Sequence, residues 1–223
     1  MITEDQRPIV IINFKGLEYE RVRAIVDDFN TIDSGLLKNV RVILAVPPSY
    51  INDLQTMTDH EIFLQDIKSP FEYTVDIFLD ELCGENRRDC AAKGVILNHP
   101  EKVLTEECLK RSFQKSKEGS LHAIVCSSSV EEGITLSKHY QPYAIAIENK
   151  LLLGKNESFT VNFPNLVKIA KDGMDSEVMV GGGVRSHRDF ARVIDDGGIG
   201  VLVSSVIVNA VRPGEALKEL ISF

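Results

Sequence analysis

Short apolar runs alternate with longer amphipathic stretches along the whole chain. Runs rich in β-branched residues predict eight strands, at 8–13, 40–46, 62–66, 94–98, 121–126, 143–148, 177–182 and 200–204. Each run is almost continuously apolar, which is typical of parallel strands buried on both faces. Between the runs, apolar residues recur at helical spacing, which predicts helices over 19–30, 104–117, 186–196 and 206–221.

The alternation of strands and helices predicts an α/β fold with parallel pairing through right-handed crossovers. Eight such units favour a closed (β/α)8 barrel. The alternative is a doubly wound open sheet, whose dinucleotide-binding form carries G-x-G-x-x-G after the first strand. Asn13-Phe14-Lys15 stands there instead, which disfavours this alternative. Eight units in 223 residues average about 28 residues, fewer than the roughly 31 of a 250-residue barrel, so we expect a single compact domain over 1–223 with shortened helices.

Charge and cysteine usage narrow the possible partners. Lys and Arg total 25 against 33 Asp and Glu, a net charge of −8, whereas nucleic-acid binding needs a basic face. No apolar run approaches the roughly 18 residues of a membrane span. The N-terminus is acidic where a secretory signal would be basic, and none of the four cysteines forms a C-x-x-C pair. We therefore expect a cytoplasmic protein without a metal site, with no nucleic-acid or membrane partner.

Polar residues at the carboxyl ends of barrel strands share one face, where catalytic groups of such barrels lie. Five predicted strands end in such residues or in small-residue turns: Asn13 and Lys15, Asn98 and His99, Glu148, Gly181-Gly182-Gly183, and Ser204-Ser205.

Each of these residues also has a plain structural interpretation. Lys15 would be a solvated loop lysine, His99 a capping histidine, and the glycines a tight strand–helix turn. The serines at 127–129 are interpreted as a helix N-cap rather than a nucleophile. Cys126 is interpreted as a small buried core residue, and the other four histidines as structural or surface residues.

Four segments together resemble the triosephosphate isomerase family in its short, archaeal form. They occur in the family's order and cover essentially the whole chain. The segments are INFK at 12–15, LNHPEK at 97–102, the strand end AIE at 146–148 followed by LLG at 152–154, and the two turns VGGGV at 180–184 and GVLVSS at 200–205.

The resemblance implies an intramolecular aldose–ketose isomerase that interconverts dihydroxyacetone phosphate and D-glyceraldehyde 3-phosphate through an enediolate, in glycolysis and gluconeogenesis, without a cofactor. It implies that Glu148 is the base, that His99 is the electrophile, and that Lys15 supplies positive charge. Asn13 would place Lys15 and contact the substrate. Main-chain N–H groups would hold the phosphate, at Leu153, Gly154, Gly183, Ser204 and Ser205.

The residue types suit this chemistry. Preorganised donors stabilise an enediolate, and we expect a helix starting at Pro100 to disfavour the charged form of His99. The sequence departs from the family at both ends of the loop after Glu148, where 149–150 is Asn-Lys and 155–156 is Lys-Asn. These changes bear on the rate and on the gating of the loop more than on the identity of the activity.

Two other functions stay open at this stage. One is a different phosphosugar barrel, such as an epimerase or an isomerase of amino-acid biosynthesis. The other is a non-catalytic homologue that binds phosphosugars. The family resemblance further implies a homodimer or homotetramer in which residues 68–77, with Phe71 and Tyr73, reach a neighbouring subunit; packing of this loop on its own barrel is the alternative.

Overall fold

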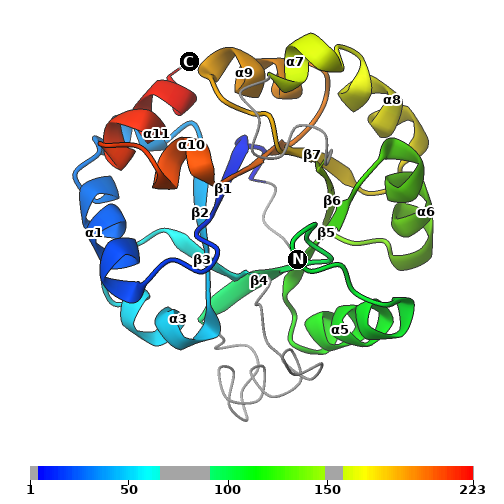
Figure 1. Ribbon diagram of the computed structural model, residues 1–223, viewed down its shortest axis with the longest axis horizontal. Coiled ribbons are helices and arrows are strands. Elements are labelled where there is room, and N and C mark those ends of the chain that lie inside the picture. The colour runs from blue at the N-terminus through cyan, green and yellow to red at the C-terminus, as the bar shows by residue number, and fades with distance from the viewer. Residues whose placement is uncertain (1–4, 66–90, 149–157, 223) are drawn as a thin grey trace.

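The predicted barrel is present. The computed structural model describes residues 5–65, 91–148 and 158–222. Eight parallel strands pair in chain order, and β8 closes the barrel against β1 (Figure 1). Every predicted strand is confirmed to within two residues at each described end: β1 Ile9–Asn13, β2 Arg41–Val46, β3 Glu61–Leu64, β4 Ala92–Leu97, β5 His122–Ser127, β6 Ala144–Glu148, β7 Glu177–Gly181 and β8 Gly200–Val203.

Helices ring the barrel on its outside (Figure 1). They are α1 Tyr19–Phe29, α2 Ser34–Leu37, α3 Pro48–Leu54, α5 Glu106–Glu118, α6 Val130–Tyr140, α7 Phe159–Asn162, α8 Leu166–Gly173, α9 His187–Asp195, α10 Ser205–Val208 and α11 Pro213–Ile221. Several span only one or two turns, as the short repeat length predicts.

One predicted helix is wrong in extent. The pattern over 206–221 predicts a single helix, but the chain forms α10 and α11 with a break at 209–212. Pro213 explains the break, because proline lacks the N–H that a helix interior needs and fits only in the first turn.

Apolar side chains form two layers, one on each side of the strands. The outer layer lies between strands and helices, and Phe14, Phe29 and Phe190 are fully buried in it. The inner layer fills the barrel itself with side chains from every strand: Ile9, Ile11, Ile43, Ala45, Phe63, Ile96, Ile124, Cys126, Ala144, Ala146, Met179 and Leu202. Because both faces of each strand are covered, the strands read as continuous apolar runs.

The inner layer also determines which residues reach the mouth of the barrel. Successive side chains of a strand point to opposite faces. Ile9 and Ile11 point inward, so the next inward position on β1 is Asn13. By the same alternation, Ala144 and Ala146 are followed on β6 by Glu148. On β1 and β6, the polar residue at the strand end therefore lies directly beyond the apolar side chains that fill the barrel.

Within the described residues, no helix is long and apolar enough to cross a bilayer.

Candidate active site

Two of the predicted site residues lie at the mouth because of strand alternation alone. Asn13 and Glu148 are each 3% exposed, and both line a cavity of about 330 Å³. Burial of a carboxylate is costly unless other groups compensate for it. The surroundings of Glu148 are therefore the centre of the site.

His99 reaches the same cavity only because the strand alternation fails just before it. Asn98 has a left-handed backbone with a φ of 58°, a conformation that asparagine tolerates better than most residues. Its side chain stays on the outer side, where Nδ2 donates to the carbonyl of Cys126 at 3.0 Å and Oδ1 accepts from the N–H of Leu104 at 3.0 Å. His99 consequently lines the cavity that Glu148 also lines.

The imidazole of His99 contacts the carboxylate of Glu148 directly. His99 Nε2 lies 3.3 Å from Glu148 Oε1, and both side chains are buried. On the other side of the ring, the backbone N–H of Glu101 donates to Nδ1 at 3.3 Å. An Nδ1 atom that accepts a hydrogen bond carries no proton, so the neutral ring has its proton on Nε2. That proton points toward Glu148 and the cavity.

The expectation of a helix starting at Pro100 is wrong. Residues 100–101 form a single turn, closed by the Lys102 N–H donating to the His99 carbonyl at 2.7 Å, and α5 starts only at Glu106. The turn ends because the Asn98 side chain takes the N–H of Leu104, and Thr105 then caps α5. The N–H of Glu101 donates to the ring at the place where a helix N-terminus was expected to disfavour the charged form of His99.

The expectation that the charged form of His99 is disfavoured is also wrong, because the pKa of His99 is raised above its ordinary value of 6.5. Burial on its own lowers this pKa, because the charged ring loses its water. The hydrogen bond and the negative charge of Glu148 outweigh burial and favour the charged ring. His60 and His122 are half-buried, and for both of them desolvation is the largest effect, so their pKa values are lowered.

Hydrogen bonds to its N–H and to its carbonyl fix the backbone of Lys15. It has a φ of 55°, which is unfavourable for a residue with a Cβ. Its N–H donates to Asn13 Oδ1 at 3.0 Å, and its carbonyl accepts a hydrogen bond from Gln65 Nε2. The ammonium Nζ lies 2.7 Å from Glu101 Oε1. The side chain of Asn13 therefore fixes the turn from which Lys15 extends into the cavity.

Glycines and serines form the opposite end of the cavity. Gly182 and Gly183 have φ values of 71° and 74°, which glycine adopts without strain. Ser204 and Ser205 follow β8 and begin α10, where the first N–H groups of a helix have no partner within the helix. Turns of this kind expose main-chain N–H groups to anions.

One part of the glycine prediction needs correction. Gly181 is not a turn residue but the last residue of β7, in register with Glu148 on β6. A Cβ on Gly181 would lie 2.5 Å from Glu148 Cγ. Gly181 therefore makes room for the carboxylate, whereas the turn consists of the two glycines that follow.

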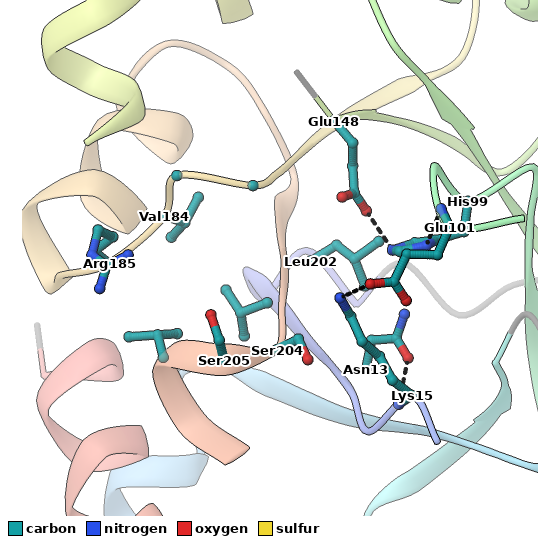
Figure 2. Close-up of a pocket in the computed structure, with 14 residues that line it drawn as sticks. Asn13, Lys15, His99, Glu101, Glu148, Val184, Arg185, Leu202, Ser204 and Ser205 are labelled. Carbon is teal, nitrogen blue, oxygen red and sulfur yellow. Dashed lines mark hydrogen bonds and ion pairs between the residues drawn. The ribbon is translucent and has the colours of Figure 1, made fainter. Parts of the chain in front are cut away.

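Figure 2 shows the resulting arrangement. Glu148 and His99 point toward each other across the cavity from Ser204 and Ser205, and Lys15 extends beside Glu101. The structure thus brings together Asn13, Lys15, His99, Glu148, Gly183, Ser204 and Ser205 around one cavity. The predicted residues Leu153 and Gly154 lie outside the described residues, as do 68–77 and both altered ends of the loop after Glu148.

Sequence reasoning missed two residues that hold the others. Glu101 pairs with Lys15 although 86 positions separate them, and Gln65 binds the Lys15 carbonyl. Glu101 follows His99 in the segment that resembles the family, which was a usable signal. For Gln65 the signal was only its position next to the end of a buried strand.

The arrangement offers a buried carboxylate, a neutral N–H donor and an ammonium group at one end and main-chain donors at the other. These groups can move a proton and stabilise a developing negative charge on a small anionic molecule. Among the described residues, no three His, Cys, Asp or Glu side chains gather closely enough to hold a metal ion.

Solved structures that resemble the chain support the fold alone. A mutant tryptophan synthase alpha-subunit from Pyrococcus furiosus aligns with a TM-score of 0.69 at 13% identity, over 97% of this chain and 98% of the other. A thiamine phosphate pyrophosphorylase from the same organism aligns with a TM-score of 0.57 at 16% identity, over 97% and 94%. At such low identity, these proteins show how widely the barrel is used.

Sequence comparisons are more specific. A triosephosphate isomerase from Methanocaldococcus jannaschii is 25% identical, over 96% of this chain and 99% of the relative. One from Pyrobaculum arsenaticum is 28% identical over 96% of each chain, and one from Methanosarcina acetivorans is 30% identical over 65% and 67%. The family model described as Triosephosphate isomerase matches residues 8–221. The chain therefore belongs to the triosephosphate isomerase family of enzymes.

Proposed function

We propose that the chain interconverts dihydroxyacetone phosphate and D-glyceraldehyde 3-phosphate, the step that links the two trioses in glycolysis and gluconeogenesis. The observation that carries the proposal is the contact of Glu148 Oε1 with His99 Nε2 at 3.3 Å in the cavity that Lys15 also lines. A base, a hydrogen-bond donor and a cation are the groups that a proton shift beside a carbonyl needs.

Glu148 would act as the base. Its carboxylate would remove a proton from the carbon next to the substrate carbonyl and return it to the neighbouring carbon. At 3% exposure, it is shielded from bulk water, which limits proton exchange and side reactions of the intermediate. A general base of this kind contributes about 10²- to 10⁴-fold to a rate.

His99 and Lys15 would stabilise the negative charge on the enediolate oxygens. The Nε2–H of neutral His99 would exchange its hydrogen bond to Glu148 for one to the substrate oxygens, while the N–H of Glu101 continues to fix the ring through Nδ1. The ammonium of Lys15, on its braced turn, would add positive charge on the same side. Donors set in place before the reaction need no reorganisation as charge develops.

The phosphate would bind at the other end of the cavity. Main-chain N–H groups of Gly183, Ser204 and Ser205 would hold it, and we propose that Leu153 and Gly154 contribute as well. With a net charge of −8, the protein must supply positive potential locally, from Lys15 and from main-chain N–H groups.

A coupled isomerase assay on the purified protein tests the proposal. Wild type should convert each triose phosphate into the other, and Glu148→Gln should reduce kcat by about 10²- to 10⁴-fold. Glu148→Asp keeps the charge but shortens the reach, so it should retain part of the activity. Activity of Glu148→Gln equal to that of wild type would overturn the assignment of the base.

Two further measurements separate the alternatives. Turnover of a different phosphosugar in a substrate panel would identify another phosphosugar isomerase or epimerase. Tight binding of a phosphorylated enediolate mimic without turnover would identify a non-catalytic homologue.

We further propose that the protein is a homodimer or homotetramer and acts in the cytoplasm, with a small phosphorylated triose as its substrate. Light scattering measures the first, and cell fractionation tests the second. A monomer that is fully active would contradict the proposed assembly.

A further inference from the structure

Asp189, on α9, joins two segments that are far apart in sequence. Its side chain is buried, with 2% exposure. Oδ1 accepts hydrogen bonds from the hydroxyls of Ser158 and Thr160, the second at 2.7 Å. Ser158 immediately precedes α7 and Thr160 lies in its first turn, and α7 lies next to α9 in Figure 1. One carboxylate oxygen is thus used entirely by the segment at 158–160.

The second oxygen serves the turn after β7. Oδ2 accepts the backbone N–H of Arg185 at 3.0 Å and that of Ser186 at 3.2 Å, together with the Ser186 hydroxyl at 3.0 Å. Arg185 follows Gly183 by two residues, and both line the proposed substrate cavity. Asp189 therefore binds the backbone immediately after the Gly182–Gly183 turn.

These five hydrogen bonds exceed what a helix cap requires. Ser186 and Asp189 form a capping box at the start of α9, and this box uses only Ser186 and Oδ2. Oδ1 contributes nothing to the cap. Despite burial, which on its own raises it, the pKa of Asp189 is lowered by hydrogen bonds from Ser158, Thr160 and its other donors. An ionised acceptor binds its donors more strongly than a neutral one.

We propose that Asp189 is a positioning residue for substrate phosphate. By bracing Arg185 against Ser158 and Thr160, it fixes the Gly182–Gly183 turn at the phosphate end of the cavity. The inference rests on the proposed function for the identity of the anion. It differs from a capping role because it requires the Oδ1 hydrogen bonds.

A double variant separates the two roles. Ser158→Ala with Thr160→Val removes both donors to Oδ1 and leaves the capping box intact. Binding of inorganic phosphate, measured by ³¹P NMR, should weaken about fivefold, the factor equivalent to the net contribution of one hydrogen bond. KM for the triose phosphates should rise by a similar factor, and kcat should change less.

Two control variants test specificity. Exchanging the two residues, as Ser158→Thr with Thr160→Ser, keeps both hydroxyls and should restore phosphate binding. Ser129→Ala removes the N-cap of α6, whose hydroxyl accepts from the Glu132 N–H at 3.1 Å. It should lower the melting temperature without changing the phosphate Kd. If the double variant fails to fold, the single variants Ser158→Ala and Thr160→Val provide the same comparison.

The outcomes distinguish this inference from the proposed function. If the phosphate Kd and KM are unchanged in the double variant while the melting temperature falls, then Asp189 has only a structural role as a helix cap. Equal weakening of phosphate binding by Ser129→Ala would also overturn the inference. If wild type shows no isomerase activity but the double variant still binds phosphate more weakly, the proposed function fails and the positioning role stands.

Discussion

Gly181 on β7 and Glu148 on β6 are register partners packed so closely that a Cβ at position 181 would lie 2.5 Å from Glu148 Cγ. The carboxylate atoms are almost as near, with Cδ at 2.7 Å and Oε1 at 2.8 Å. No side-chain atom approaches a Cβ this closely without a shift. The position of Glu148 against His99 therefore depends on the absence of a side chain on the neighbouring strand.

Gly181→Ala should therefore impair catalysis as well as stability. The new methyl group would push Glu148 away from its contact with His99, and a displacement of about 1 Å from the reactive geometry costs on the order of 10²-fold in rate. The cost to the free energy of unfolding should be about 1–3 kcal/mol, typical of overpacking. Steady-state kinetics and urea unfolding measure the two effects.

Gly173→Ala is the matched control for this variant. A Cβ on Gly173, in α8, would lie 2.6 Å from Cδ1 of Ile134, which is the movable end of a side chain. This substitution should keep wild-type kcat. If Gly181→Ala retains full kcat, or if Gly173→Ala loses as much, then the close packing does not position the base.

The pairing of His99 with Glu148 predicts a specific response to Glu148→Gln. The raised pKa of His99 is due to Glu148, which outweighs the lowering effect of burial. Removing the charge should therefore lower the pKa of His99 toward or below 6.5, as desolvation does for half-buried His60 and His122. Histidine titration by NMR on the ligand-free protein measures this change.

The same pair should make stability depend on pH. Since the folded pKa of His99 lies above the unfolded value of about 6.5, its contribution is fully present below that pH and is lost as the pH rises through the folded pKa. The difference in stability between wild type and Glu148→Gln should thus shrink from pH 6 upward. A difference that grows over this range would contradict the pairing. The titrations of His60 and His122 should be the same in both proteins.

Strand alternation explains how much of this site the sequence could predict. Asn13 and Glu148 each continue a series of inward-facing apolar residues. Correct assignment of the strands therefore also locates these two side chains. His99 does not follow this rule. It enters the cavity only because Asn98 adopts a φ of 58°, a conformation that no hydrophobic pattern encodes.

The hydrophobic pattern of the sequence also does not show contacts between distant segments. Glycines at 181–183 looked like one turn, yet Gly181 belongs to β7 and faces Glu148. The apolar spacing over 206–221 continued past the break before Pro213, because both helices bury apolar side chains in the same core layer. Hydrophobic periodicity shows which face of an element is buried. It does not show where the element breaks or which residues pack against it.

The lowered pKa of Asp5 predicts that stability also decreases at acidic pH. Hydrogen bonding from Arg7, whose Nη2 lies 2.6 Å from Asp5 Oδ2, lowers the pKa of Asp5 from 3.8 to about 2, and the charges of Arg7 and Arg41 add to this. A lowered carboxyl pKa stabilises the fold above the unfolded value, and this contribution is lost as the pH falls toward 2. Asp5→Asn should therefore reduce the free energy of unfolding at pH 7 by about 1 kcal/mol, since the pair is partly exposed.

Urea unfolding at pH 7 and at pH 2 measures the effect of Asp5→Asn. The gap between variant and wild type should close at the lower pH. Asp27→Asn, at an exposed position on α1, is the matched control and should leave stability nearly unchanged. If the difference in free energy of unfolding persists at pH 2, then Asp5 stabilises the fold through its hydrogen bonds and not through its negative charge.

Lys15 and Glu101 make the sharpest prediction for the proposed reaction. Lys15→Met should reduce kcat/KM by on the order of 10²- to 10³-fold, the effect of removing one preorganised electrostatic group. Glu101→Gln should have a smaller effect, because it leaves an acceptor for Lys15 Nζ and keeps the backbone N–H that orients His99. Lys110→Met, on the exposed side of α5, should have wild-type kinetics. If Glu101→Gln costs more than Lys15→Met, then the carboxylate of Glu101 acts on the substrate itself rather than through the ammonium that it holds.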